Sequence, residues 1–90
     1  MYEITIEDHK VVVAAGGAAG GAEWKLYVDS DLRDTCYVPE SPFRMAWTTI
    51  LRASIVCRDG QKRGVEYQMS VGFFSKNFRF LFAGNEIKKW

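Results

Sequence analysis

Apolar and polar residues alternate over the first third of the chain, which is the pattern of β-strands with one buried face. The alternation predicts a strand over residues 2–7, a turn at Asp8–His9 and a second strand over 10–15. Pairing Glu7 with Lys10 brings the apolar residues of both strands onto one face, so this register is favoured. The chain therefore begins with a predicted β-hairpin.

Residues 14–22 consist almost entirely of glycine and alanine, which have little preference for helix or strand and few side-chain atoms to pack. We expect a flexible loop there. A third strand is predicted over 23–28, with Trp24, Leu26 and Val28 pointing inward. A charged turn over 29–34 and a short fourth strand over 35–38 complete this half.

The spacing of apolar residues changes from two to three and four after Ser41, which predicts a helix over residues 42–57. Ser41 is a good N-cap, Pro42 suits the first helical position, and Asp59–Gly60 would end the helix. The predicted buried stripe consists of Phe43, Ala46, Trp47, Ile50, Leu51 and Ser54.

The last third of the chain again alternates and predicts a second hairpin. Its first strand would bury Val65, Tyr67, Met69, Val71 and Phe73, and its second Phe78, Phe80 and Phe82. An even loop such as Lys76–Asn77 keeps both apolar sets on one face, whereas a three-residue loop would separate them. Residues 85–90 form a short, basic tail.

Together these elements predict an α+β fold with the order β-β-β-(β)-α-β-β. One antiparallel sheet of five or six strands would carry the helix (about 42–57) on one face, as a single domain of residues 1–90. Its other face would be polar and exposed to water. That face would carry Glu3, Thr5, Lys25, Tyr27, Glu66, Gln68, Ser70 and Arg79.

Composition supports a domain that folds without covalent staples, because 48% of its 90 residues are hydrophobic. No stretch is long and apolar enough for a transmembrane helix, and the N-terminal residues do not resemble a signal peptide. We therefore expect a cytoplasmic protein that does not bind membranes. Cys36 and Cys57 would then be reduced thiols, with buried packing as their most common role.

Charge is divided unequally along the chain. Residues 1–40 carry a net charge of −5 and residues 41–90 a net charge of +6, although the total is only +1. Such asymmetry favours recognition of a charged partner, because a surface of one sign attracts molecules of the other. The alternative is that the two groups of charges pair with each other within the fold.

The residues needed for catalysis or for a cofactor are scarce. His9 is the single histidine and would lie in a turn beside Asp8, where neighbouring side chains point apart. The acidic turn 29–34 lacks the glycine and distal glutamate of a calcium-binding EF-hand loop. The glycine-rich stretch lacks the lysine that ends a phosphate-binding loop. We expect no enzyme activity, no catalytic residue, no metal and no cofactor.

The sequence therefore favours a non-catalytic protein-binding module. It suits a small inhibitor or adaptor of the kind found among phage and mobile-element accessory proteins, for example an inhibitor of a host nucleic-acid-handling complex. The predicted partner-binding residues are Asp29, Asp31, Asp34, Arg44, Arg52, Lys62, Arg63, Arg79 and Trp90. The alternative is direct nucleic-acid binding by the basic C-terminal half, with Phe74 or Trp90 stacking on bases. A pI of about 7.8 weighs against it.

Overall fold

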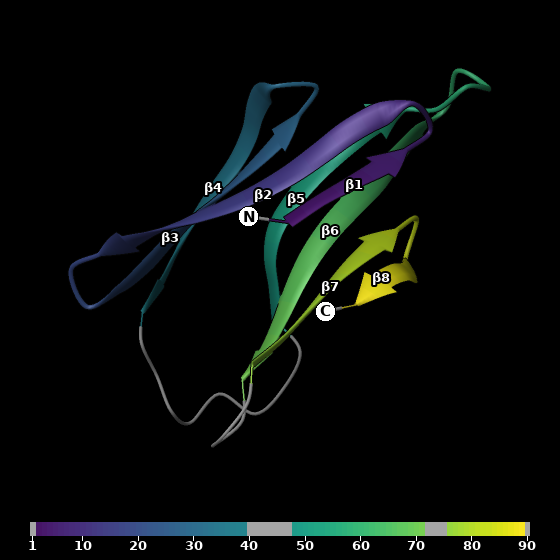
Figure 1. The fold of residues 1–90 in the computed structure, drawn as a ribbon. Coiled ribbons are helices and arrows are strands. Elements are labelled where there is room, and N and C mark those ends of the chain that lie inside the picture. Colours follow the sequence, from purple (N-terminus) through teal and green to yellow (C-terminus); the bar gives the residue numbers. More distant parts are fainter. Residues whose placement is uncertain (1, 40–47, 72–75, 90) are drawn as a thin grey trace.

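The described part of the chain is entirely β-structure. The computed structural model describes residues 2–39, 48–71 and 76–89 and contains eight strands (Figure 1). They are β1 (Tyr2–Ile6), β2 (His9–Ala18), β3 (Gly21–Val28), β4 (Asp31–Pro39), β5 (Thr48–Val56), β6 (Lys62–Val71), β7 (Lys76–Phe82) and β8 (Asn85–Lys89). Four consecutive strands form sheet A, in the order β1-β2-β3-β4, and the next four form sheet B, in the order β5-β6-β7-β8. All the pairings are antiparallel.

The predicted α+β class is wrong, because residues 48–56 of the expected helix form strand β5. The first part of that prediction, residues 42–47, lies outside the described residues. From Leu51 the strand alternates: Leu51, Ile55 and Cys57 are buried, while Arg52, Ser54 and Val56 are exposed. β-Branched residues, which favour strands, are also frequent in this segment.

A shift in the strand pairing explains why β5 resembles a helix in the sequence. The register between β5 and β6 changes between Thr49 and Leu51, and Ile50 and Leu51 are both buried. Two adjacent buried residues are ordinary in a helix but break the alternation of a regular strand. This adjacent buried pair accounts for part of the three-and-four spacing from which a helix was predicted.

The two sheets face each other and share one hydrophobic core (Figure 1). Sheet A contributes Ile6, Val11, Val13, Trp24, Leu26, Val28 and Val38, and sheet B contributes Ile50, Leu51, Ile55, Cys57, Val65, Tyr67, Met69 and Phe80. Aromatic rings cross the interface: Tyr2 and Trp24 of sheet A lie with their ring centroids 5.3–5.9 Å from Tyr67 and Phe78 of sheet B. Each sheet can bury its apolar face because the other sheet covers it.

Three of the hairpins turn through two residues with positive φ, the geometry that matches the twist of paired strands. The turns are Glu7–Asp8, Asp29–Ser30 and Ala83–Gly84. The predicted turn at Asp8–His9 is therefore displaced by one residue, and His9 belongs to β2. The third turn makes most of the predicted basic tail a strand, β8.

The glycine- and alanine-rich stretch is not the expected loop. Residues up to Ala18 lie in β2 and residues from Gly21 lie in β3, so the hairpin turns at Ala19–Gly20. The Tyr37 hydroxyl of β4 donates a hydrogen bond of 2.5 Å to the Ala19 carbonyl oxygen. Pairing with β3 and this contact supply the stabilisation that the small side chains lack.

The predicted polar face is divided between two surfaces. Glu3, Thr5, Lys25 and Tyr27 lie on the outer face of sheet A, whereas Glu66, Gln68, Ser70 and Arg79 lie on the outer face of sheet B. Their assignment to a water-facing side is confirmed for both groups. Their placement on one sheet is wrong, because the chain forms two.

Candidate interaction surfaces

The charge asymmetry of the sequence becomes an asymmetry between the two sheets. Residues 2–39, which form sheet A, contain seven acidic and three basic residues, a net charge of −4. Residues 48–89, which hold the strands of sheet B, contain eight basic and three acidic residues, a net charge of +5. Since the sheets form the two layers of the molecule, one layer is acidic and the other is basic.

The three acidic residues predicted to bind a partner lie on β4 or on the turn before it. Asp29 lies in the turn of the β3–β4 hairpin, Asp31 is the first residue of β4, and both are exposed. Asp34 lies further along β4, and its carboxylate accepts hydrogen bonds from the backbone N–H groups of Thr35 and Arg52, both of 2.8 Å. Asp34 thus joins the neighbouring edges of the two sheets, whereas Asp31 remains at the hairpin tip.

The predicted basic residues do not form one cluster. Arg52, Lys62 and Arg79 lie on the outer face of sheet B, whereas Arg63 alternates to the other side of β6. Lys62 is exposed, and Arg52 lies beside the Glu66 carboxylate, 3.7 Å away. The remaining two predicted residues, Arg44 and Trp90, lie outside the described residues, as does Phe74.

A line of polar side chains crosses the outer face of sheet B from β5 to β8. Gln68 donates to the Glu66 carboxylate (3.2 Å), and Arg79 Nε donates to the Gln68 side-chain oxygen (2.9 Å). Arg79 Nη1 also contacts the Glu86 carboxylate at 3.4 Å. These contacts fix the positions of the polar side chains of β6, β7 and β8 relative to one another on the outer face of sheet B.

A shallow, open hollow of about 290 Å³ lies beside this line of side chains. Arg52, Ala53, Ser54, Gly64, Val65 and Glu66 line it. Ser54 lies opposite Gly64 in the register, and a Cβ atom added to Gly64 would meet no atom within 4 Å. The outer face of sheet B is therefore open above the middle of β5 and β6.

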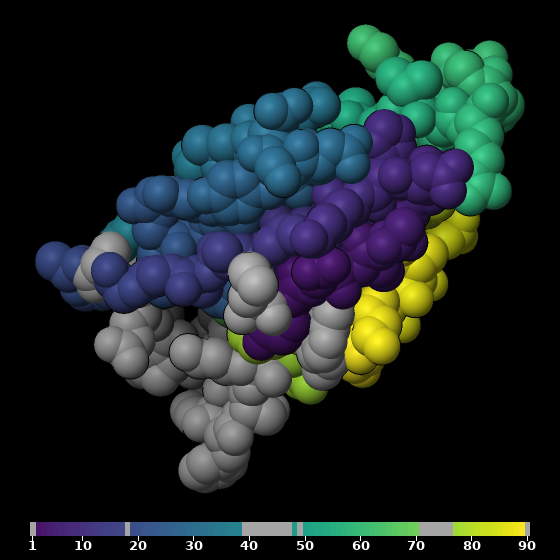
Figure 2. All heavy atoms as spheres, turned by 45° about the horizontal axis from the view of Figure 1, so that its top comes forward, coloured from purple at the N-terminus to yellow at the C-terminus, as the bar shows by residue number. Residues whose placement is uncertain are grey.

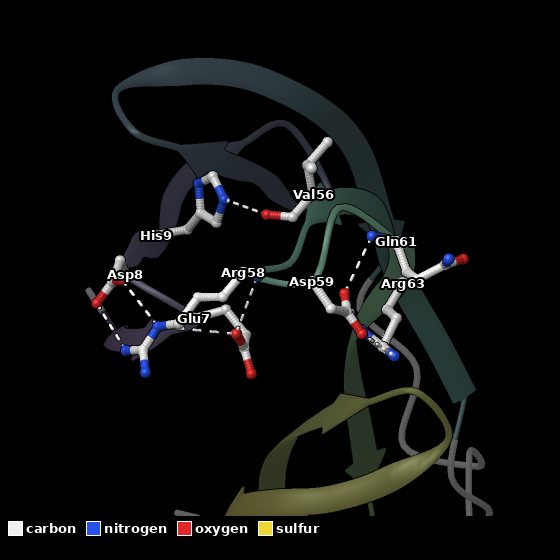
Figure 3. A network of polar contacts seen from close by, with 8 residues as sticks. All are labelled: Glu7, Asp8, His9, Val56, Arg58, Asp59, Gln61 and Arg63. Atoms are coloured by element: carbon white, nitrogen blue, oxygen red, sulfur yellow. Dashed lines mark hydrogen bonds and ion pairs between the residues drawn. The ribbon is translucent and has the colours of Figure 1, made fainter.

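At one end of the molecule, Arg58 links the two layers (Figure 3). Its guanidinium donates two hydrogen bonds to the Asp8 carboxylate, at 2.7 and 2.8 Å, and its backbone N–H donates to Glu7 at 3.2 Å. The hydrogen bond and charge of Arg58 lower the pKa of Asp8, so this carboxylate remains charged. Part of the charge asymmetry is thus neutralised within the fold.

His9 makes a second link at the same end. Its Nδ1 lies 2.5 Å from the Asp29 carboxylate. Its Nε2 lies 2.8 Å from the backbone carbonyl oxygen of Val56 on β5, a contact drawn in Figure 3. Both partners are acceptors, so only the doubly protonated imidazolium can donate to both. The bond to Asp29, followed by the bond to Val56, raises the pKa of His9 above 6.5.

The β5–β6 connection carries its own ion pair. Arg63 donates to both oxygens of Asp59, at 2.8 and 3.0 Å, and Asp59 also accepts from the Gln61 backbone N–H (Figure 3). The Arg63 hydrogen bonds are the main reason that the pKa of Asp59 is lowered to about 2. Since this contact already occupies the Arg63 guanidinium, Arg63 is a poorer candidate for a partner than Lys62.

The contacts of His9 do not suit a general base. Both ring nitrogens of His9 already face an acceptor within the protein, which leaves neither of them to accept a proton from a substrate. Among the described residues, no group of three or more histidine, cysteine or acidic side chains could hold a metal ion. In that same part of the chain, no helix is long and apolar enough to cross a lipid bilayer.

Sequence reasoning missed Glu7, Asp8 and Arg58 as a link between layers and missed β8 as an exposed edge. The link joins residues about 50 positions apart, and no local pattern announces such a contact. A signal for β8 was present, because Ala83–Gly84 separates two segments that can both be strands. The turn was missed because alanine is not a preferred residue before glycine in a two-residue hairpin turn.

Comparison with known proteins gives no further guide to function: no family model, no curated protein and no solved structure matches this chain.

Proposed function

We propose that this protein is a non-catalytic protein-binding module that uses its basic layer, sheet B, to hold an acidic partner. The observation that carries the proposal is the separation of charge between the sheets, −4 on the strands and turns of sheet A and +5 on those of sheet B. A basic face of this kind attracts an acidic surface and orients the molecule as it approaches.

The outer face of sheet B fits a protein partner better than a nucleic acid. In the described residues of sheet B, the aromatic side chains belong to the core or pack against it, namely Tyr67, Phe78, Phe80 and Phe82. Single-stranded nucleic acids are usually held by exposed aromatic rings, which this part of the face does not present.

The test compares reversal of charge on the two layers. In one variant Arg52, Lys62 and Lys89 become Glu; in the other Glu3, Glu23 and Asp31 become Lys. We expect proteins captured from a lysate by the unaltered chain to be lost from the first variant and retained by the second. Cross-linking should place the retained partner on sheet B.

Direct nucleic-acid binding is measured in parallel, with single- and double-stranded DNA at about 50 and 200 mM salt. Tight binding that weakens steeply with salt, without capture of a protein, would reject the proposed function in favour of nucleic-acid binding. Equal loss of capture in both layer variants would reject sheet B as the contact surface.

A further inference from the structure

Strand β8 is the outermost strand of sheet B. In the described structure it pairs with β7 on one side, and the sheet order places no strand on its other side. All five of its residues, Asn85 to Lys89, are exposed. Figure 2 shows β8 as the yellow rim of the molecule. A strand in this position presents a row of backbone N–H and C=O groups to which another extended chain can bind.

The other sheet edges are less accessible. At the β5 edge the Asp34 carboxylate of β4 accepts the Arg52 backbone N–H, so a side chain of sheet A already occupies one of the edge donors. Strand β1 contains one buried and two half-buried residues, whereas β8 contains none. The remaining edge strand, β4, likewise has one buried and two half-buried residues, Val38, Asp34 and Cys36. Strand addition is therefore easiest at β8.

The β8 edge is basic on both of its faces. Lys88 lies opposite Phe80 and thus on the inner side of the sheet plane, and Lys89 lies opposite Arg79 on the outer side. The acidic residue of the strand, Glu86, already contacts Arg79. Ile87 lies between Glu86 and Lys88, at the point where the β7–β8 register shifts, and is 41% exposed.

The charges of β8 determine which kind of strand can pair with its free edge. Lysines on an edge strand oppose pairing with another strand that carries the same charges, and they are a common protection against self-association. An acidic strand would remove that repulsion, because its carboxylates would approach Lys88 and Lys89. An apolar residue between the carboxylates would pack against Ile87.

We propose that β8 is a docking edge for an acidic, extended segment of a partner protein, which pairs with it as a fifth strand of sheet B. This inference rests on the proposed function and specifies how the partner is held. Backbone hydrogen bonds would provide the pairing, and the two lysines with Ile87 would select the sequence.

The probe is a capped eight-residue peptide with two central valines flanked on each side by alternating glutamate and threonine. Of three control peptides, one has lysine in place of glutamate, and the other two carry N-methyl groups at alternate amides, so that one edge or the other cannot form hydrogen bonds. Two charge-matched variants are compared with the unaltered protein: K88E/K89E at the edge, and K10E/K25E on sheet A. Affinity is measured by titration, and amide shifts locate the bound peptide.

We expect the acidic peptide to shift the amide resonances of β8 and to bind at least tenfold more weakly to K88E/K89E, but less than threefold more weakly to K10E/K25E. The lysine peptide should not bind, and methylation on the edge that faces β8 should abolish binding. Binding that survives both N-methylations, each made in a separate peptide, or that maps to another strand, would overturn strand addition while leaving the basic-layer proposal intact. The absence of any binding, or concentration-dependent pairing of β8 with a second copy, would also overturn it.

Discussion

At the scale of single residues, Tyr67 stands out because its buried hydroxyl lacks a hydrogen-bond partner in the described structure. Burial, and then the nearby Tyr2 hydroxyl, raises the pKa of Tyr67 far above its ordinary value. Leaving a buried polar group unsatisfied costs about 1–3 kcal/mol, so we expect Tyr67→Phe to increase the free energy of unfolding by about 1 kcal/mol. Urea denaturation measures this change.

The matched control for that prediction is Tyr37→Phe, which removes a hydroxyl bonded to Ala19. It should lower the free energy of unfolding by about 0.5–1.5 kcal/mol. If Tyr67→Phe instead destabilises the protein as much as the control does, the Tyr67 hydroxyl has a partner and our account of it is wrong.

Ala83 is a second residue whose conformation carries a prediction. It has a φ of 51° in the β7–β8 turn and is followed by Gly84 at 84°. A left-handed conformation costs alanine about 1 kcal/mol, whereas asparagine adopts it readily and Asn–Gly is a preferred pair in such turns. We expect Ala83→Asn to raise the thermal midpoint and Ala83→Val to lower it. Scanning calorimetry of both variants checks the prediction, and a higher midpoint for valine would contradict it.

At the scale of elements, His9 makes the contact between β2, the β3–β4 turn and β5 depend on pH. Asp29 and the Val56 carbonyl face its ring nitrogens, and Asp8, itself bound to Arg58, adds a weaker attraction. Because the folded-state pKa of His9 is raised above 6.5, the stability it contributes is full below about pH 6.5 and is lost as the pH rises through the folded pKa. Asp29, whose pKa is lowered, stays ionised throughout this range.

We therefore expect an NMR titration to give His9 a pKa above 6.5, and the thermal midpoint to fall between about pH 6 and pH 8. In His9→Gln that fall should disappear, and in Asp29→Asn the pKa of His9 should decrease. A His9 pKa at or below 6.5 in the unaltered protein would show that the two acceptors do not hold the imidazolium.

The same elements show what the sequence could and could not predict. Alternation located β1, β3, β6 and β7 but missed β8, and the errors of register were by even numbers: Val13 pairs with Tyr2 rather than Ile4, and Phe82 pairs with Val65 rather than Val71. An even shift keeps every side chain on its face, so among the residues whose burial is described the predicted inner faces of these strands were right although the pairs were wrong. The helix prediction failed at Ile50–Leu51, where an irregular pairing imitates helical spacing.

The contacts of the candidate surfaces were harder to predict. Arg79 was assigned to the outer face from its strand position, which needs only local alternation. The contacts of Arg58 with Asp8 and of His9 with Val56 join residues that are 50 and 47 positions apart. These contacts form only where the two sheets pack against each other. The local sequence of neither sheet specifies how the sheets pack.

At the scale of the whole molecule, the core and the surface charges make unequal contributions. The core joins side chains of both sheets, several of them completely buried, including Leu26, Leu51 and Tyr67. The ion pair of Arg58 with Asp8 is exposed, and such pairs contribute little to stability because water screens the charges. Hydrophobic burial between the layers, rather than attraction between acidic and basic layers, must therefore hold the two sheets together.

This reasoning predicts that neither sheet remains folded when the other unfolds, since each depends on its partner to cover its apolar face. Leu51→Ala, a change in sheet B alone, should lower the free energy of unfolding by about 2–5 kcal/mol, and the urea midpoints measured at Val13 of sheet A and Val65 of sheet B should decrease together. Arg58→Ala should lower that free energy much less than Leu51→Ala does. Separate midpoints for Val13 and Val65 in the Leu51 variant would mean that the sheets are independent units, and a larger loss in the Arg58 variant would mean that charge pairing holds the layers together.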